Sequence, residues 1–163
     1  MNRFAVVTFS VAIPLTAANA ELPDAIAAKG EAVVIEYHAE GAQIYECKAG
    51  SDGQLAWQFR EPIASMFHNG ATIGRHYAGP SWESGGSIVV GKVAGRAPGA
   101  TAKDILWLKL DVSDRRGDGP LKDATAVQRI NTKGGVKEGK CEKAGELYAE
   151  PYAADYVFLR KGS

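Results

Sequence analysis

The chain has 163 residues with 19 basic and 19 acidic side chains, and therefore no formal net charge. This balance argues against nucleic acid or an anionic membrane surface as its main partner. The length suits one domain with a sizeable core, and no stretch after the N-terminus approaches the roughly 20 apolar residues of a membrane-spanning helix. We therefore expect no nucleic-acid partner and no membrane insertion.

The N-terminal 20 residues have the three parts of a secretory signal. A basic start at Arg3 precedes an apolar run over residues 4–15, and Ala18 and Ala20 are the small residues that a signal peptidase requires. We therefore expect cleavage after Ala20 and one mature β domain over residues 21–163. The protein would be exported, either to the periplasm or into the medium.

Beyond a short helical turn over residues 23–30, the apolar pattern has mostly a period of two, which indicates strands. A turn is expected at Ala39-Glu40-Gly41, another at residues 84–87, and a helical turn or crossing loop over residues 62–67. Pro151 is expected to divide the last segment, because proline is poorly tolerated inside a central strand. The predicted strands are residues 31–37, 42–48, 55–60, 77–83, 88–93, 105–112, 125–132 and two short strands within 146–160.

Many short strands, glycine-containing turns and little helix predict an all-β fold. The two architectures that fit are an antiparallel β-sandwich and a partly closed β-barrel. Cys47 and Cys141 are the only cysteines of the chain. In an exported protein they would form one disulfide, although two free buried thiols are the alternative.

One segment, residues 74–83, combines a histidine, an arginine, two large aromatic residues and a carboxylate. Aromatic faces with a few directed polar groups are typical of small-ligand sites. The same side chains could instead be structural, with His76 hydrogen-bonded across a hairpin and Arg129 paired with Glu83. The candidate ligand-binding residues are Arg75, His76, Tyr77, Trp82, Glu83, Arg129 and Asn131.

No pattern in the chain predicts a metal, a cofactor or a catalytic nucleophile. The three histidines, His38, His68 and His76, do not have the short spacings of metal ligands. The chain has no nucleophile elbow, and both cysteines are expected to be bonded to each other. We therefore expect no metal, no cofactor and no assigned catalytic residue.

Four segments in this order resemble one family, the exported bacterial and fungal proteins called domain of unknown function 3455. The resemblance covers nearly all of the mature chain, and implies a secreted single domain with one disulfide and no established activity. The segments are residues 41–47 (GAQIYEC), 76–83 (HYAGPSWE), 128–135 (QRINTKGG) and 152–158 (YAADYVF).

Three functions fit these observations. The first is a ligand-binding or surface-interaction module for a small molecule or a glycan. The second is a hydrolytic enzyme that uses His76 with a nearby carboxylate, and the third is a structural or envelope-stress protein without a ligand. A cleft lined by His76, Trp82 and Arg129 would favour the first two hypotheses over the third.

Overall fold

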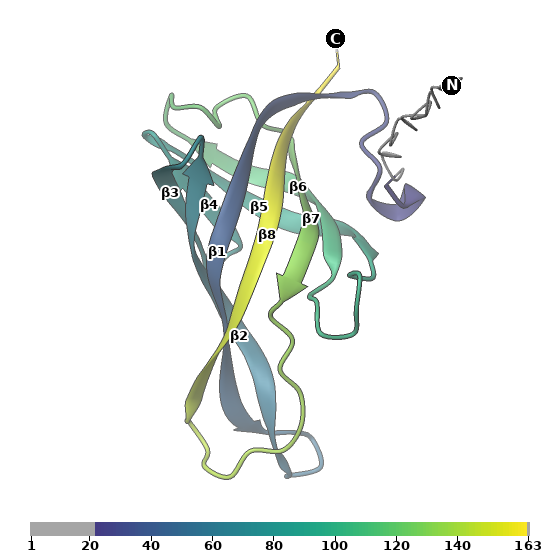
Figure 1. Ribbon diagram of the computed structural model, residues 1–163, viewed down its shortest axis with the longest axis vertical. Coiled ribbons are helices and arrows are strands. Elements are labelled where there is room, and N and C mark those ends of the chain that lie inside the picture. The colour runs from purple at the N-terminus through teal and green to yellow at the C-terminus, as the bar shows by residue number, and fades with distance from the viewer. Residues whose placement is uncertain (1–21, 163) are drawn as a thin grey trace, which may run out of the picture.

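The computed structural model describes residues 22–162, and shows eight strands and one turn of 3-10 helix, η1, over Asp24–Ile26 (Figure 1). The signal peptide expected at residues 1–20 lies outside the described residues. The strands are β1 (Glu31–Ala49), β2 (Leu55–His68), β3 (Ala71–Tyr77), β4 (Ser81–Ser84), β5 (Ser87–Ala97), β6 (Trp107–Arg116), β7 (Ala126–Gly134) and β8 (Leu147–Lys161).

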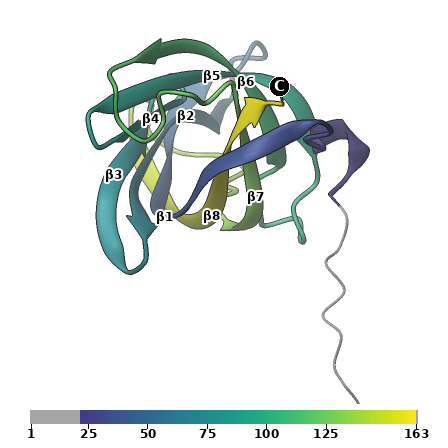
Figure 2. The same ribbon diagram turned by 90° about the horizontal axis from the view of Figure 1, so that it is seen from above.

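The eight strands form one closed antiparallel barrel in which every strand pairs with its neighbours in sequence. The ring closes between β1 and β8, whose register runs from the pair Glu31 and Lys161 to the pair Glu46 and Leu147. Figure 2, which looks along the barrel, shows this ring. The all-β prediction is therefore confirmed, and of the two predicted architectures the chain adopts the barrel, closed completely.

The predicted turn at Ala39-Glu40-Gly41 is wrong, because β1 runs through it without interruption. The register of β1 with β2 shows why a glycine is needed at this point of the strand. A Cβ atom on Gly41 would collide with the backbone of Ile63 and Ala64 in β2. Gly41 therefore permits a close approach between two strands and does not end either of them.

The two expected breaks near prolines are also wrong, since β2 continues through Pro62 and β8 continues through Pro151. At the two prolines, β2 and β8 pair with β1 on one side only: β3 pairs with β2 from Ala64 onward, and β7 pairs with β8 from Tyr152 onward. Proline is tolerated where a strand has a free side, because the missing N–H then costs no ladder hydrogen bond.

This geometry gives the molecule a three-stranded arm that projects from one end of the barrel (Figure 1). We define the arm as residues 42–49 of β1, 55–63 of β2 and 147–151 of β8. The loop between β7 and β8 returns along the arm and is fastened to it by the disulfide between Cys47 and Cys141. The predicted disulfide is therefore confirmed.

The opposite end of the barrel is filled by side chains. The loop between β6 and β7 inserts Leu121 and Ala124, which are fully buried with Phe158, Trp82 and Val89 in the main core cluster. The backbone N–H of Leu121 donates to the hydroxyl of Ser87 at 3.0 Å. We call this end the plugged end, and the end that carries the arm the mouth.

The short helical turn η1 lies against the outside of the barrel. Ile26 is buried there, and the side-chain amide of Gln128 in β7 donates to the Ile26 carbonyl oxygen at 2.6 Å. The turn expected over residues 23–30 is thus present over its first part. Within residues 22–162 no helix has the length and apolar character needed to cross a membrane.

Candidate functional site

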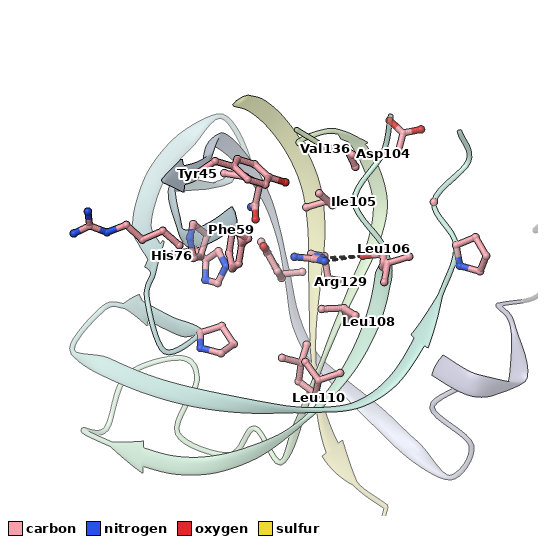
Figure 3. Close-up of a pocket in the computed structure, with 18 of the residues that line it drawn as sticks. Tyr45, Phe59, His76, Asp104, Ile105, Leu106, Leu108, Leu110, Arg129 and Val136 are labelled. Atoms are coloured by element: carbon pink, nitrogen blue, oxygen red, sulfur yellow. Dashed lines mark hydrogen bonds between the residues drawn. The ribbon is translucent and has the colours of Figure 1, made fainter. Parts of the chain in front are cut away.

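A cavity of about 960 Å³ opens at the mouth of the barrel. Its walls come from both ends of the sequence, because strands that are distant in the chain meet in the ring. Leu108 and Leu110 of β6 line one wall, and Val93 of β5 is the register partner of Leu110. The rim includes Phe59 from the arm and Leu106 from the loop before β6 (Figure 3). Most of this lining is apolar.

Three ring systems form the inner end of the cavity. His76 of β3 stacks on Trp82 of β4, with ring centroids 4.7 Å apart and planes 12° apart. Tyr156 of β8 packs against both of them, at centroid distances of 4.9 Å from His76 and 5.4 Å from Trp82. These rings separate the cavity from the core of the plugged end.

His76 is held in one tautomer by the hairpin that carries it. Its Nδ1–H donates to the backbone carbonyl oxygen of Ser81 at 2.9 Å, which leaves Nε2 as a hydrogen-bond acceptor. Burial lowers the pKa of His76 from 6.5 to about 3, partly opposed by this hydrogen bond and assisted by the positive charge of Arg129. The imidazole is therefore neutral at physiological pH.

Arg129 enters the cavity from β7, four strands away from β3 and thus on the opposite side of an eight-stranded ring (Figure 3). Its Nε and Nη2 donate to the carbonyl oxygen of Leu106 at 3.1 Å and 2.8 Å. Burial raises the pKa of Tyr156, while the charge of Arg129 acts in the opposite direction. The phenol therefore remains a neutral hydroxyl beside a guanidinium.

Polar contacts hold the loops of the mouth away from the opening. A carboxylate oxygen of Asp104 accepts the backbone N–H of Gly134 at 2.7 Å, and its other oxygen accepts two bonds from Thr101. These bonds, of which that from Gly134 is the largest cause, lower the pKa of Asp104. The hydroxyl of Tyr45 donates to the Gly135 carbonyl oxygen at 2.7 Å. This bond fixes the start of the loop between β7 and β8, which carries Cys141 and which we call the disulfide loop.

The structure brings three of the seven predicted site residues together. His76, Trp82 and Arg129 all line the cavity. They do so because His76 and Trp82 are paired across the β3–β4 hairpin and share its inner face, while Arg129 is on the inner face of β7 with Val127. The tight turn at Gly79-Pro80 joins the two strands and lies at the rim.

The other four predicted residues lie on the outside of the barrel. Arg75 and Tyr77 flank His76 in β3 and therefore point to the opposite face of the strand. Arg75 donates to one oxygen of Glu83 at 2.8 Å and stacks over the Tyr77 ring at 5.0 Å. Asn131 is exposed and donates to Asp155 at 2.9 Å, so it does not line the cavity either.

Several lining residues carried no functional signal in the sequence. Leu106 and Leu108 belong to residues 105–112, the most apolar segment after the expected N-terminal signal, and such a segment predicts a buried core strand rather than the wall of an open cavity. Tyr45, Phe59 and Tyr156 lie on strands whose inward face was predictable by alternation. Nothing in the sequence distinguishes an inward residue at the mouth from one at the plugged end.

Within the described part of the chain, the arrangement does not give His76 the carboxylate partner that acid–base chemistry would use. Glu83 is next to Trp82 in sequence but lies on the outer face, and His76 makes no hydrogen bond to a carboxylate among the described residues. A general base works best with a pKa near the operating pH, which the pKa of His76 is not. Residues 22–162 also contain no group of three histidine, cysteine or carboxylate side chains able to hold a metal ion.

Comparison with known proteins identifies the family. Residues 27–160 match the family described as Protein of unknown function (DUF3455). The chain belongs to this family. No curated protein and no solved structure matches the chain.

Proposed function

We propose that this protein binds a small, largely apolar organic molecule in the mouth of its barrel. The observation that carries the proposal is the cavity of about 960 Å³, which lies inside a closed barrel, has apolar walls and a few convergent polar groups. Barrels of eight strands are just wide enough to hold one small ligand, and pockets of this size bind molecules of drug-like dimensions.

Exposed apolar side chains at the rim support the same conclusion. Phe59 is 55% exposed and Leu106 is 45% exposed, and both line the opening. A ligand that entered the mouth would cover part of this surface and gain about 25 cal/mol for each Å² of apolar area removed from water. A glycan gains less from such walls, and we therefore favour the small apolar molecule.

The proposal is tested by titration with a neutral fluorophore such as N-phenyl-1-naphthylamine, whose emission rises in apolar surroundings. We expect saturable binding with one site per chain. Leu108→Trp, which fills the cavity from β6, should reduce the affinity at least about tenfold, because the probe and the indole compete for one volume.

The matched control places the same indole on the outside of the barrel. Ile63 is 56% exposed and does not line the cavity, so Ile63→Trp should bind the probe like the wild type. Absence of saturable binding by the wild type, or equal binding by Leu108→Trp, would refute the proposal. Binding of oligosaccharides but not of the apolar probe would favour the glycan hypothesis instead.

We also propose that the protein acts outside the cytoplasm. The disulfide between Cys47 and Cys141 is compatible with export, since such bonds persist in oxidising compartments. The N-terminal pattern adds the cleavage position. The intact mass of the protein recovered from its native host should correspond to a chain that begins at Glu21; an uncleaved mass would contradict this.

A further inference from the structure

Arg129 is a charged group inside an apolar cavity without a counterion in the part of the chain that the structure describes. Its two short hydrogen bonds go to one neutral acceptor, the carbonyl oxygen of Leu106, and its other near partner is the neutral hydroxyl of Tyr156. A guanidinium has five N–H donors, so part of its hydrogen-bonding capacity is left unused by residues 22–162. Leaving a charge partly removed from water and unpaired is costly, and an anion that completed its bonding would recover that cost.

The other charged residues that line the cavity are already paired or lie at the rim. Arg60 contacts Glu61 at 3.2 Å and Glu46 at 3.7 Å. Asp104 accepts three hydrogen bonds from the loops of the mouth, and Glu138 is exposed on the disulfide loop. Arg129 is therefore the one charge of the described lining that is available to a ligand inside the cavity.

Hydrogen-bond donors without an acceptor occur elsewhere in the lining. The side-chain nitrogens of Gln43 and Trp82 are buried and have no acceptor among the described residues. The hydroxyl of Tyr156 lies 3.3 Å from that of Tyr152 and keeps its proton, because burial raises the pKa of the phenol. The lining thus contains buried donors without an acceptor in addition to Arg129, and these fit a ligand that brings acceptor oxygens.

We propose that the ligand is an apolar carboxylic acid whose carboxylate is bound by Arg129. The inference rests on the proposed function and specifies its ligand class. The planar fork of the guanidinium matches a carboxylate, which can accept two parallel N–H bonds. The apolar body lies along Leu106, Leu108 and Leu110 on one side, and against the rings of Trp82 and Phe59 on the other.

The test compares acids with neutral molecules of the same shape, by displacement of the neutral fluorophore. Two pairs cover the two kinds of apolar body: octanoate with 1-octanol, and 2-naphthoate with 2-naphthalenemethanol. In at least one pair the acid should displace the probe at a concentration at least about tenfold below that of its alcohol, since a charged hydrogen-bonded pair adds about 1.5–3 kcal/mol. The pair with the tighter acid identifies the body as aliphatic or aromatic.

Arg129→Met should abolish the preference for the acid and retain the affinity for the neutral fluorophore. Arg129→Gln serves as a second variant, because its amide can still donate to the Leu106 carbonyl oxygen and support the fold. Arg60→Met is the matched control: it removes a lining cation that already has carboxylate partners, and the preference should be unchanged.

The possible results separate this inference from the proposed function. If the wild type binds the fluorophore but prefers neither acid to its alcohol, the ligand class is wrong and the binding function stands. The same holds if the preference survives in Arg129→Met and Arg129→Gln. If the wild type does not bind the fluorophore at all, the proposed function fails, and this inference fails with it.

Discussion

The two ends of this barrel are built from the same eight strands and differ in what their loops do. At the plugged end, the loop between β6 and β7 directs Leu121 and Ala124 into the ring, where both are fully buried. At the mouth, the loop before β6 is held back by Asp104, which binds the backbone of Gly134. One loop therefore fills the barrel, and the other leaves a cavity.

The difference shows that the open end is maintained by specific contacts. A wide apolar opening would tend to collapse, because covering apolar surface is favourable. Tyr45, Asp104 and the disulfide each attach a loop to the wall or the arm, so that the loops cannot fold inward. We therefore expect stability to be concentrated at the plugged end, with the proposed binding surface at the mouth, and three predictions test this division.

The largest expected effect comes from truncating one apolar side chain at each end. Phe158→Ala at the plugged end should lower the free energy of unfolding by about 3–5 kcal/mol, because it leaves a cavity in a close-packed core. Leu106→Ala at the mouth should change it by about 0.5 kcal/mol or less, since that side chain is already in contact with water. Urea unfolding at pH 7 measures both.

Binding of the neutral fluorophore provides the converse measurement. Leu106→Ala should weaken it, whereas Phe158→Ala should leave it close to wild type at temperatures where the variant is folded. Similar losses of stability for the two variants would show that the ends are not distinct in the way described.

Removal of the disulfide should have the next largest effect. The bond joins residues 94 positions apart in sequence, and replacing Cys47 and Cys141 by alanine should lower the free energy of unfolding by about 2–4 kcal/mol. Hydrogen exchange should accelerate first in residues 134–146, whose backbone is bonded to the arm at Trp57 and Leu55.

Amides of β4 and β5 near the plugged end are the internal control for that measurement. Their exchange should speed up only as much as the global loss of stability requires. A uniform acceleration across the molecule would mean that the disulfide does not stabilise the mouth selectively.

The smallest of the three effects concerns His76, which lies between the two ends. Its pKa is about 3 in the folded protein and about 6.5 when unfolded. Below pH 6.5 the unfolded chain therefore takes up a proton that the folded chain does not, so this group makes the protein less stable as the pH falls from 6.5 toward 3. Between pH 7 and pH 5 the loss is about 2 kcal/mol.

His76→Asn keeps a donor for the Ser81 carbonyl oxygen and removes the titration. The variant will be less stable at every pH, because its side chain cannot stack on Trp82, but its stability should fall less between pH 7 and pH 5. Urea unfolding of both proteins at the two pH values measures the difference. Parallel pH dependence of the wild type and the variant would contradict a buried neutral imidazole.

Part of this architecture could be predicted from local sequence. The turn at Gly85-Gly86, the disulfide and the alternation of β7 follow from glycine chemistry, cysteine count and period two. Gly41 and Pro151 misled the prediction, because whether such residues break a strand depends on the neighbouring strand. That information is carried by the pairing of β1 with β2 and β8, which is not local.

The candidate site shows the same limit. His76, Trp82 and Arg129 could be selected as one group from residue type. Arg75 and Tyr77 could have been separated from them by the alternation of β3, which places them on the other face. The apolar wall at Leu108 could not be recognised, because a lining leucine and a core leucine have the same pattern. The two kinds of leucine differ only in whether a loop covers them, and the loop before β6 leaves Leu108 uncovered.

Closure of the ring between β1 and β8 has a consequence for how the molecule folds. The strand that completes the barrel is the last of the eight, and it contributes Tyr152, Ala154, Tyr156 and Phe158 to the core. Pairings between residues so distant in sequence form slowly, because a long chain segment must be ordered before they contribute energy. During synthesis, the ring therefore stays open between β1 and β7. The chain can acquire its folded state only after β8 has emerged and paired with both strands.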